Sequence, residues 1–303
     1  MGGQLRPDQG GQFTADSPPM TLCVGWIRKI NETEEICLAA DSCFSGNQRF
    51  YAAPKIFPLS RGDCAIACAG STTYSLPIVE HIMRAVEING PVNDRAYDFL
   101  RIIHLIEDIA NKCLFEEQWV QEDAKEGPNF TMIIAGYSWL TKSARLFVLK
   151  YDTRLKQMKA SKTSTMMKTP FAVIGDEDMI EPFKRKVHKA LEADGVIPGG
   201  RIDFQPLEVL IGFINDSGIT TVAGHPQMVK VYSYMQTLPI GFYYPSSGDI
   251  YYFGRPLLGY ETFPYPIYDM DTKQFKYMKV KSDEFKRFHE ETKPLGKKFK
   301  GIK

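Results

Sequence analysis

Two apolar segments near the start of the chain, TLCVGWI at 21–27 and EEICLAADS at 34–42, constrain the fold more than any other feature. The polar stretch RKINET between them is typical of a turn, so the two segments predict a pair of neighbouring strands. Residues 1–20 precede this pair and are rich in glycine, glutamine and proline, with few residues able to form a core. We expect this leader to be disordered or absent from the mature protein.

The rest of the chain alternates between groups of strands and groups of helices. Apolar runs and strand-forming residues predict further strands at PKIFPL, DCAIACAG, NFTMIIAGYS, ARLFVLKYD, FAVIGD and HPQMVKVYSYM. Apolar residues at helical spacing predict helices at about 71–90, 94–113, 178–193 and 206–215. Two strand groups separated by helices indicate a layered α+β domain.

The amino-acid composition changes at about residue 237. The segment GFYYPSSGDIYYFGRPLLGYETFPYPIYD is dense in aromatic residues, glycine and proline, and a lysine-rich tail follows at 281–303. The chain therefore divides into a leader at 1–20, a domain at 21–236 and an extension at 237–303. The composition of the extension is compatible with covering the surface of an oligomer.

Composition and charge exclude several classes of function. The formal net charge is +1, which gives no overall electrostatic attraction to nucleic acids or membranes. No apolar run is long enough to cross a bilayer, and the N-terminus lacks the pattern of a signal peptide. The six cysteines form no CxxC pair and the five histidines lack metal-ligand spacing, so we expect buried thiols in a reducing, cytoplasmic environment, with no metal and no cofactor.

An ordered set of residues in the first 70 positions suggests a specific chemistry. The set consists of Thr21 at the start of a strand, Asp41 in the motif AADS, Lys55 before an apolar strand, and Gly70 in the motif AGS. This pattern resembles the proteasome and HslV class of N-terminal-nucleophile hydrolases, and most closely the bacterial proteasome-like family called Anbu. The resemblance covers most of residues 20–235. It implies a four-layer αββα sandwich, a threonine peptidase or amidase, a peptide or protein substrate, and a homo-oligomeric ring or open helical ring.

The resemblance also implies a role for each residue of the set. Thr21 would be the nucleophile, and its own free α-amine would accept the proton from its hydroxyl. Lys55 would hold the developing charge, Asp41 would fix the lysine, and the backbone N–H of Gly70 would donate to the oxyanion. Each residue alone also has an ordinary structural interpretation, as a strand, turn or loop residue.

Four further residues come from the later part of the resemblance. The loop NDSGITTVAGHP resembles the family's aspartate-then-serine loop, in which Asp216 matches the aspartate and Thr220 or Thr221 takes the place of the serine. These residues would orient the N-terminal amine. Asp176 stands where the family often has a serine, and its carboxylate could accept a hydrogen bond from the amine and raise the amine's pKa.

The mechanism requires Thr21 to become the N-terminus. Either Thr21 removes the leader by attacking the preceding carbonyl, or translation starts at Met20 and an aminopeptidase removes the methionine. We favour the second route, because Met20 directly precedes the threonine. Two other functions are compatible with the pattern: a catalytically silent structural subunit, and an amidase for a small molecule with the aromatic extension lining its pocket.

Overall fold

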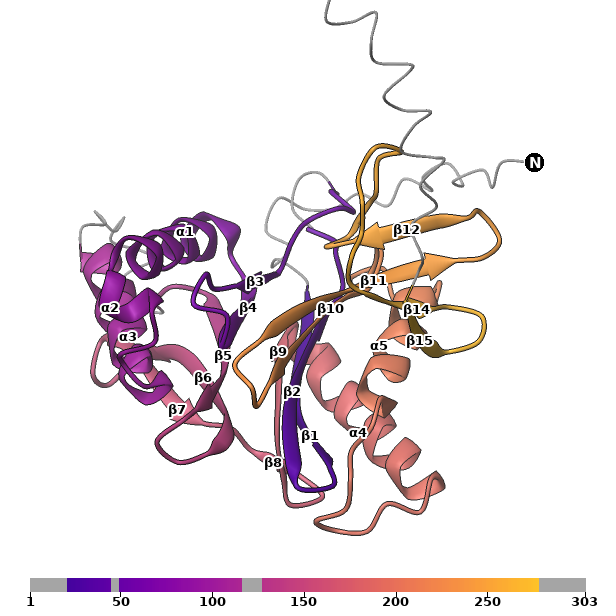
Figure 1. The fold of residues 1–303 in the computed structure, drawn as a ribbon, viewed down its shortest axis with the longest axis horizontal. Helices are drawn as coiled ribbons and strands as arrows, with labels where there is room; N and C mark the ends of the chain where they lie inside the picture. Colours follow the sequence, from indigo (N-terminus) through magenta and orange to yellow (C-terminus); the bar gives the residue numbers. More distant parts are fainter. Residues whose placement is uncertain (1–20, 45–48, 116–126, 278–303) are drawn as a thin grey trace, which may run out of the picture.

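The computed structural model describes residues 21–44, 49–115 and 127–277, which form two open sheets with helices on their outer faces (Figure 1). This part of the chain combines helices with open sheets whose strand pairs are antiparallel except for β11 with β14, and this arrangement is compatible with the predicted α+β class. The leader at 1–20 and the lysine-rich tail at 281–303 lie outside the described residues. Within the described ranges, no helix combines the length and apolarity needed to span a membrane.

The larger sheet has the strand order β13-β12-β11-β10-β2-β1-β9-β8, with β14 and β15 attached beside β11. Its strands are β1 (Leu22–Ile30), β2 (Thr33–Ala40), β8 (Thr165–Met166), β9 (Thr169–Gly175), β10 (Gln227–Tyr232), β11 (Thr237–Tyr244), β12 (Asp249–Tyr252), β13 (Arg255–Pro256), β14 (Pro266–Asp269) and β15 (Gln274–Tyr277).

The smaller sheet has the order β3-β4-β5-β6-β7. Its strands are β3 (Ile56–Pro58), β4 (Cys64–Gly70), β5 (Phe130–Ser138), β6 (Ser143–Asp152) and β7 (Gln157–Lys162). The helices are α1 (Thr72–Ile88), α2 (Gly90–Asn93), α3 (Phe99–Phe115), α4 (Glu177–Ala193) and α5 (Gln205–Asn215).

Alternation along the strands explains how the sheets are covered. In β1, Leu22, Val24 and Trp26 pack in the cluster that contains α4 and α5, whereas Cys23 and Ile27 pack in the cluster between the two sheets. Successive side chains of a strand point to opposite faces, so a strand buried on both faces reads as a continuous apolar run. The apolar run predicted for β1 therefore reflects a layer on each side of it.

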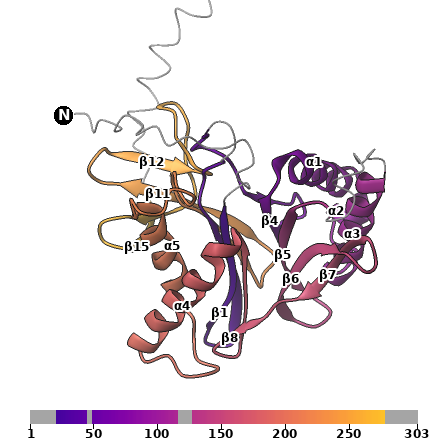
Figure 2. The same ribbon diagram turned by 180° about the vertical axis from the view of Figure 1, so that it is seen from behind.

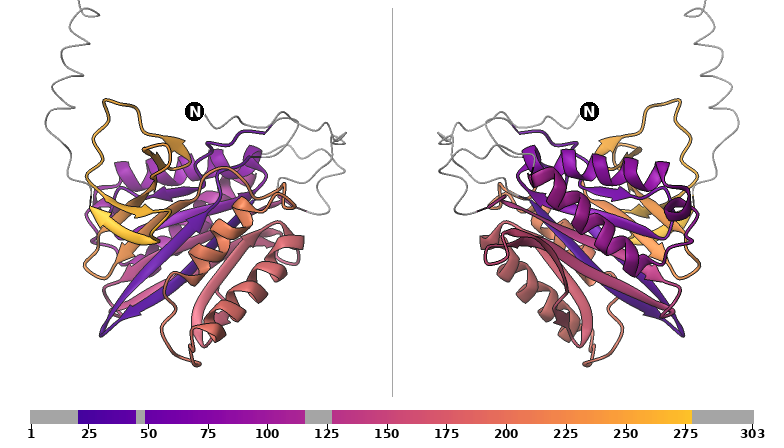
Figure 3. Two further views of the ribbon diagram at one scale, coloured as in Figure 1. Left: turned by 90° about the vertical axis from the view of Figure 1, so that its right-hand side faces the viewer. Right: turned by 90° about the vertical axis from the view of Figure 1, so that its left-hand side faces the viewer.

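Strand β4 contributes only small side chains to the layer between the sheets. Ala65, Ala67 and Ala69 pack in this layer, whereas Cys64, Ile66 and Cys68 pack toward α1 and α3. Figure 3 shows α1 and α3 on the outer side of the smaller sheet and α4 and α5 on the outer side of the larger one, and Figure 2 shows α4 from behind. The small-residue strand predicted at DCAIACAG is thus β4, which presents its alanines to the larger sheet and its larger side chains to the helices.

Two details differ from the sequence expectations. The second helix was expected from about residue 94, but α3 begins at Phe99, because the Asp98 carboxylate accepts a hydrogen bond from the backbone N–H of Leu100 at 2.9 Å and caps the first turn. Strands β7, β8 and β11–β15 were not predicted. The aromatic segment continues the larger sheet, since β11 pairs with β10 through Met228 opposite Ile240.

Candidate active site

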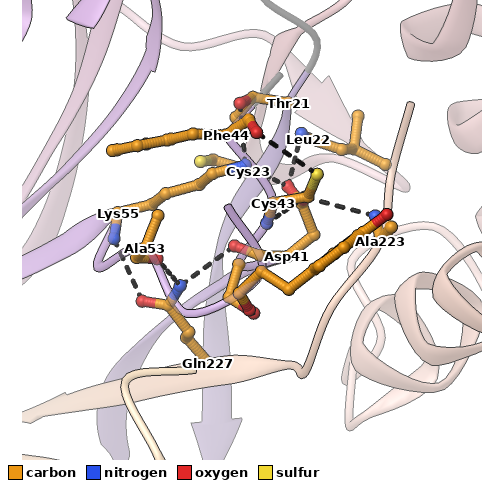
Figure 4. Close-up of polar contacts among 12 residues, drawn as sticks. Thr21, Leu22, Cys23, Asp41, Cys43, Phe44, Ala53, Lys55, Ala223 and Gln227 are labelled. Atoms are coloured by element: carbon orange, nitrogen blue, oxygen red, sulfur yellow. Dashed lines mark hydrogen bonds and ion pairs between the residues drawn. The ribbon is translucent and has the colours of Figure 1, made fainter. Parts of the chain in front are cut away.

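Three of the residues singled out from the sequence meet at one buried point (Figure 4). The Lys55 ammonium donates a hydrogen bond to Thr21 Oγ1 at 2.7 Å and pairs with Asp41 Oδ1 at 2.8 Å. Lys55 and Asp41 have no exposed surface, and Thr21 is 4% exposed. The three side chains therefore form one row in which the cation lies between the hydroxyl and the carboxylate.

The fold brings these residues together from both sheets. Thr21 precedes β1 and Asp41 follows β2, and the pairing of these strands places Cys23 opposite Ala40, so that the two site residues lie at the same end of the hairpin. Lys55 precedes β3 of the smaller sheet, where its carbonyl accepts from the backbone N–H of Cys68 at 3.0 Å. The lysine side chain therefore crosses from one sheet to the other.

The Asp41 carboxylate has four hydrogen-bond donors. Oδ1 accepts from the Lys55 ammonium and, at 2.9 Å, from the backbone N–H of Leu22. Oδ2 accepts from the backbone N–H groups of Cys43 at 3.0 Å and Ala223 at 3.4 Å. Four donors match the acceptor capacity of a carboxylate, so this group is held in one orientation.

A buried glutamine that the sequence analysis did not single out holds the backbone on both sides of the ion pair. The Gln227 amide nitrogen donates to the carbonyls of Asp41 at 3.0 Å and Ala53 at 2.7 Å. Its amide oxygen accepts from the backbone N–H of Lys55 at 3.0 Å. The signal for this role was a glutamine at the start of the buried strand QMVKVY, because a buried amide requires hydrogen-bond partners.

The main chain of Thr21 is fixed by the turn that leads into α4. The backbone N–H of Asp176 donates to the Thr21 carbonyl at 2.9 Å. Gly175 has φ +141°, and a Cβ atom added there would lie 1.8 Å from the same carbonyl oxygen. Only glycine allows this close approach of the two backbone segments.

A cavity of about 630 Å³ adjoins this turn. Gly70 and Gly175 both line it, together with Asp176 from the start of α4 and Lys150 from β6. Gly70 has φ +100°, and no hydrogen bond joins it to Thr21 among the described residues. The cavity nevertheless places Gly70 on the same open space as the backbone that contacts Thr21.

The remaining predicted residues are not brought onto the Thr21 side chain. Asp176 caps α4, where its side chain accepts from the backbone N–H of Asp178 at 3.1 Å. The exposed Asp216 accepts in the same way from Gly218 at 2.9 Å, and Thr220 is exposed. Thr221 differs, because its hydroxyl is buried and has no hydrogen-bond partner within the described part of the chain.

Burial disfavours the thiolate form of the cysteines near the site. Burial raises the pKa of Cys23 well above its usual value, although Lys55 acts in the opposite direction, and burial also raises the pKa of Cys43. A protonated thiol is a poor nucleophile. The hydroxyl of Thr21 is the side-chain group at this point that contacts the Lys55 ammonium. Within the described ranges, no cluster of three or more His, Cys, Asp or Glu side chains could hold a metal ion.

The arrangement of Thr21, Asp41 and Lys55 can support covalent acyl transfer. Because the Thr21 oxygen accepts a hydrogen bond from the ammonium, its own proton points away from Lys55 and is free to be transferred to a base. The same ammonium stabilises the oxygen as negative charge develops on it. Comparison of the chain with protein-family models finds no match, and comparison with curated proteins finds no significant match.

Proposed function

We propose that this protein is an N-terminal threonine hydrolase that cleaves peptide or amide bonds through an acyl-enzyme. One observation carries the proposal: the buried Lys55 ammonium lies 2.7 Å from Thr21 Oγ1 and 2.8 Å from the carboxylate of Asp41. The Asp41 carboxylate supplies the countercharge that a buried lysine requires, and the contact with the Thr21 hydroxyl is the one that the proposed chemistry uses.

The proposed reaction begins when Thr21 has a free α-amine. Thr21 Oγ1 attacks the substrate carbonyl carbon, and the hydroxyl proton passes to the amine directly or through one water molecule. The tetrahedral intermediate collapses and expels the amine product, which takes the proton from the ammonium of Thr21. The ester that remains is hydrolysed by water, which releases the carboxylic acid product and restores the threonine.

The other residues of the site assist this reaction in different ways. Lys55 stabilises the negative charge on Oγ1 as its proton leaves, and Asp41 keeps the ammonium in place. The backbone N–H of Gly70 is proposed to donate to the oxyanion formed from the carbonyl oxygen. Thr221 is proposed to orient the α-amine, because its buried hydroxyl is available for a hydrogen bond.

The fold is consistent with the same class of enzyme. We propose that the two facing sheets and their outer helices are the αββα sandwich of N-terminal-nucleophile hydrolases, with residues 237–303 as an extension. The apolar layer between the sheets and the position of Thr21 at the end of an interior strand of the larger sheet support this assignment. Assembly into a homo-oligomeric ring is part of the proposal, and the mass of the intact particle in solution tests it.

Hydrolysis of a peptide library by protein whose N-terminus is Thr21 tests the proposed activity. We expect turnover by the wild type, weak turnover by Thr21→Ser, and none by Thr21→Ala or Lys55→Met. Lys29→Met is the matched control, because Lys29 lies on β1 with a side chain that is 54% exposed. Equal turnover by the wild type and Thr21→Ala would refute the proposal.

A further inference from the structure

We infer that the aromatic strands β11 and β12 position the Asp41 carboxylate, and that His225, Tyr244 and Tyr251 are positioning residues for the reaction of Thr21. This inference rests on the proposed function, since it assigns a role in that reaction to a segment that the proposed mechanism does not use. It starts from the loop that precedes β10.

The loop at 222–225 contacts the site directly. The backbone N–H of Ala223 donates to Asp41 Oδ2, and the Ala223 carbonyl accepts from the backbone N–H of Ser42 at 3.2 Å. The backbone N–H of His225 donates to Ser42 Oγ at 2.7 Å, and Ser42 Oγ donates to the Tyr51 carbonyl at 2.7 Å. The position of this loop therefore sets the position of one of the four donors to the carboxylate.

The extension holds the loop through the His225 ring. This ring stacks on Tyr251 of β12, with ring centroids 3.4 Å apart and an interplanar angle of 21°. It also meets the edge of Tyr244 of β11, and His225 Nδ1 is hydrogen-bonded to the Tyr244 hydroxyl at 3.1 Å. Two strands of the extension thus fix one side chain of the loop in both distance and orientation.

The turn after β12 packs against Ser42, which the loop at 222–225 also contacts. Gly254 has φ +85°, and a Cβ atom added there would lie 2.4 Å from the Ser42 Cβ. A Cβ atom added to Gly224 would lie 2.5 Å from Ser42 Oγ. Ser42, the residue next to Asp41, therefore lies between the loop and the extension with no free space on either side.

These contacts form a continuous path from the extension to the reacting groups. It runs from Tyr244 and Tyr251 to His225, from the loop of His225 to Asp41, and from Asp41 to the ammonium that contacts Thr21 Oγ1. Small displacements of a positioned catalytic group lower rates strongly, by up to about 100-fold for 1 Å. Loss of the His225 contacts should therefore slow the chemical step and leave substrate binding unchanged.

The kinetics of labelling by a peptide β-lactone test the inference. The full chain is used after mass measurement shows Thr21 at its N-terminus, and the maximal labelling rate and the half-saturating lactone concentration are determined separately. We expect Tyr244→Phe to lower the maximal rate about threefold to tenfold, the equivalent of one hydrogen bond, with an unchanged half-saturating concentration. Tyr243→Phe removes a hydroxyl from the neighbouring residue of β11 and should have no effect.

A second pair of variants, at His225, tests the inference independently if Tyr244→Phe disturbs folding. His225→Ala should lower the maximal rate by about tenfold to 100-fold, and His225→Phe, which keeps a ring to stack on Tyr251 but not the hydrogen bond, should restore it to about the rate of Tyr244→Phe. Labelling of Tyr244→Phe and His225→Ala at the wild-type maximal rate would overturn the inference alone. Failure of the wild type to be labelled would instead overturn the proposed function, and the inference with it.

Discussion

Lys55 and Asp41 form an ion pair of 2.8 Å in which neither side chain has any exposed surface. Burying two charges is unfavourable unless each has a full set of partners, and removal of one partner leaves the other uncompensated. The pair therefore contributes to stability and to the proposed chemistry through the same contact, and the two contributions can be separated by mutation.

Lys55→Met should lower the free energy of unfolding by about 3–5 kcal/mol, because it leaves the Asp41 carboxylate buried without a countercharge. The double variant Lys55→Met/Asp41→Asn should recover much of this stability, because it removes both charges. Neither variant should hydrolyse peptides. Urea denaturation and peptide turnover measure the two effects, and full activity in the double variant would contradict the role assigned to the ammonium.

Gln227→Leu should lower the free energy of unfolding by about 2–4 kcal/mol, because it leaves the backbone N–H of Lys55 and two buried carbonyls without partners. Gln157→Leu is the control, since Gln157 is an exposed residue at the start of β7. Urea denaturation gives both values. Equal effects of the two substitutions would show that the Gln227 hydrogen bonds do not stabilise the fold.

Gly175→Ala should destabilise the protein by at least about 2 kcal/mol more than Gly195→Ala. Both glycines have positive φ, +141° and +69°, so both substitutions introduce backbone strain. Only at Gly175 does the added Cβ meet another atom, the Thr21 carbonyl oxygen, whereas nothing lies within 4 Å of the Cβ added at Gly195. Thermal denaturation of the two variants measures the loss of stability that each substitution causes.

Acid should destabilise the protein through His225. Burial lowers the pKa of His225 from its ordinary value of 6.5 to about 4, against the opposing effect of Asp249. Between these two pH values the unfolded chain binds more protons at this residue than the folded chain. The contribution of neutral His225 to stability is therefore present above pH 6.5 and is lost as the pH falls toward 4.

The measurement for this prediction is the free energy of unfolding of the wild type and of His225→Phe at several pH values. Carboxylates elsewhere titrate in both proteins, so the difference between the two curves isolates the histidine. We expect the wild type to lose stability relative to His225→Phe as the pH falls through this window. A difference that does not change with pH would contradict the burial of a neutral imidazole.

The meeting of Thr21, Asp41 and Lys55 was predicted from the resemblance to proteasome-like hydrolases, which rests on the order of these residues along the chain, and the structure brings them together. The role of Gln227 was not predicted, because its partners lie more than 170 positions away in the chain. A strand pattern shows that a side chain is buried but not which distant backbone group it meets. The strands of the extension were missed for a related reason, since β12–β15 are only two to four residues long and the pairing of β11 with β10 depends on the rest of the sheet being in place.

Reaction with a peptide epoxyketone tests the central claim most directly. This reagent forms a six-membered ring with an N-terminal threonine, because the hydroxyl attacks the ketone and the α-amine opens the epoxide. We predict that protein beginning at Thr21 gains the mass of one inhibitor, mapped to its first residue, and that Thr21→Ala and Lys55→Met gain none. Absence of the adduct from protein with a free Thr21 N-terminus and an intact fold would contradict the account.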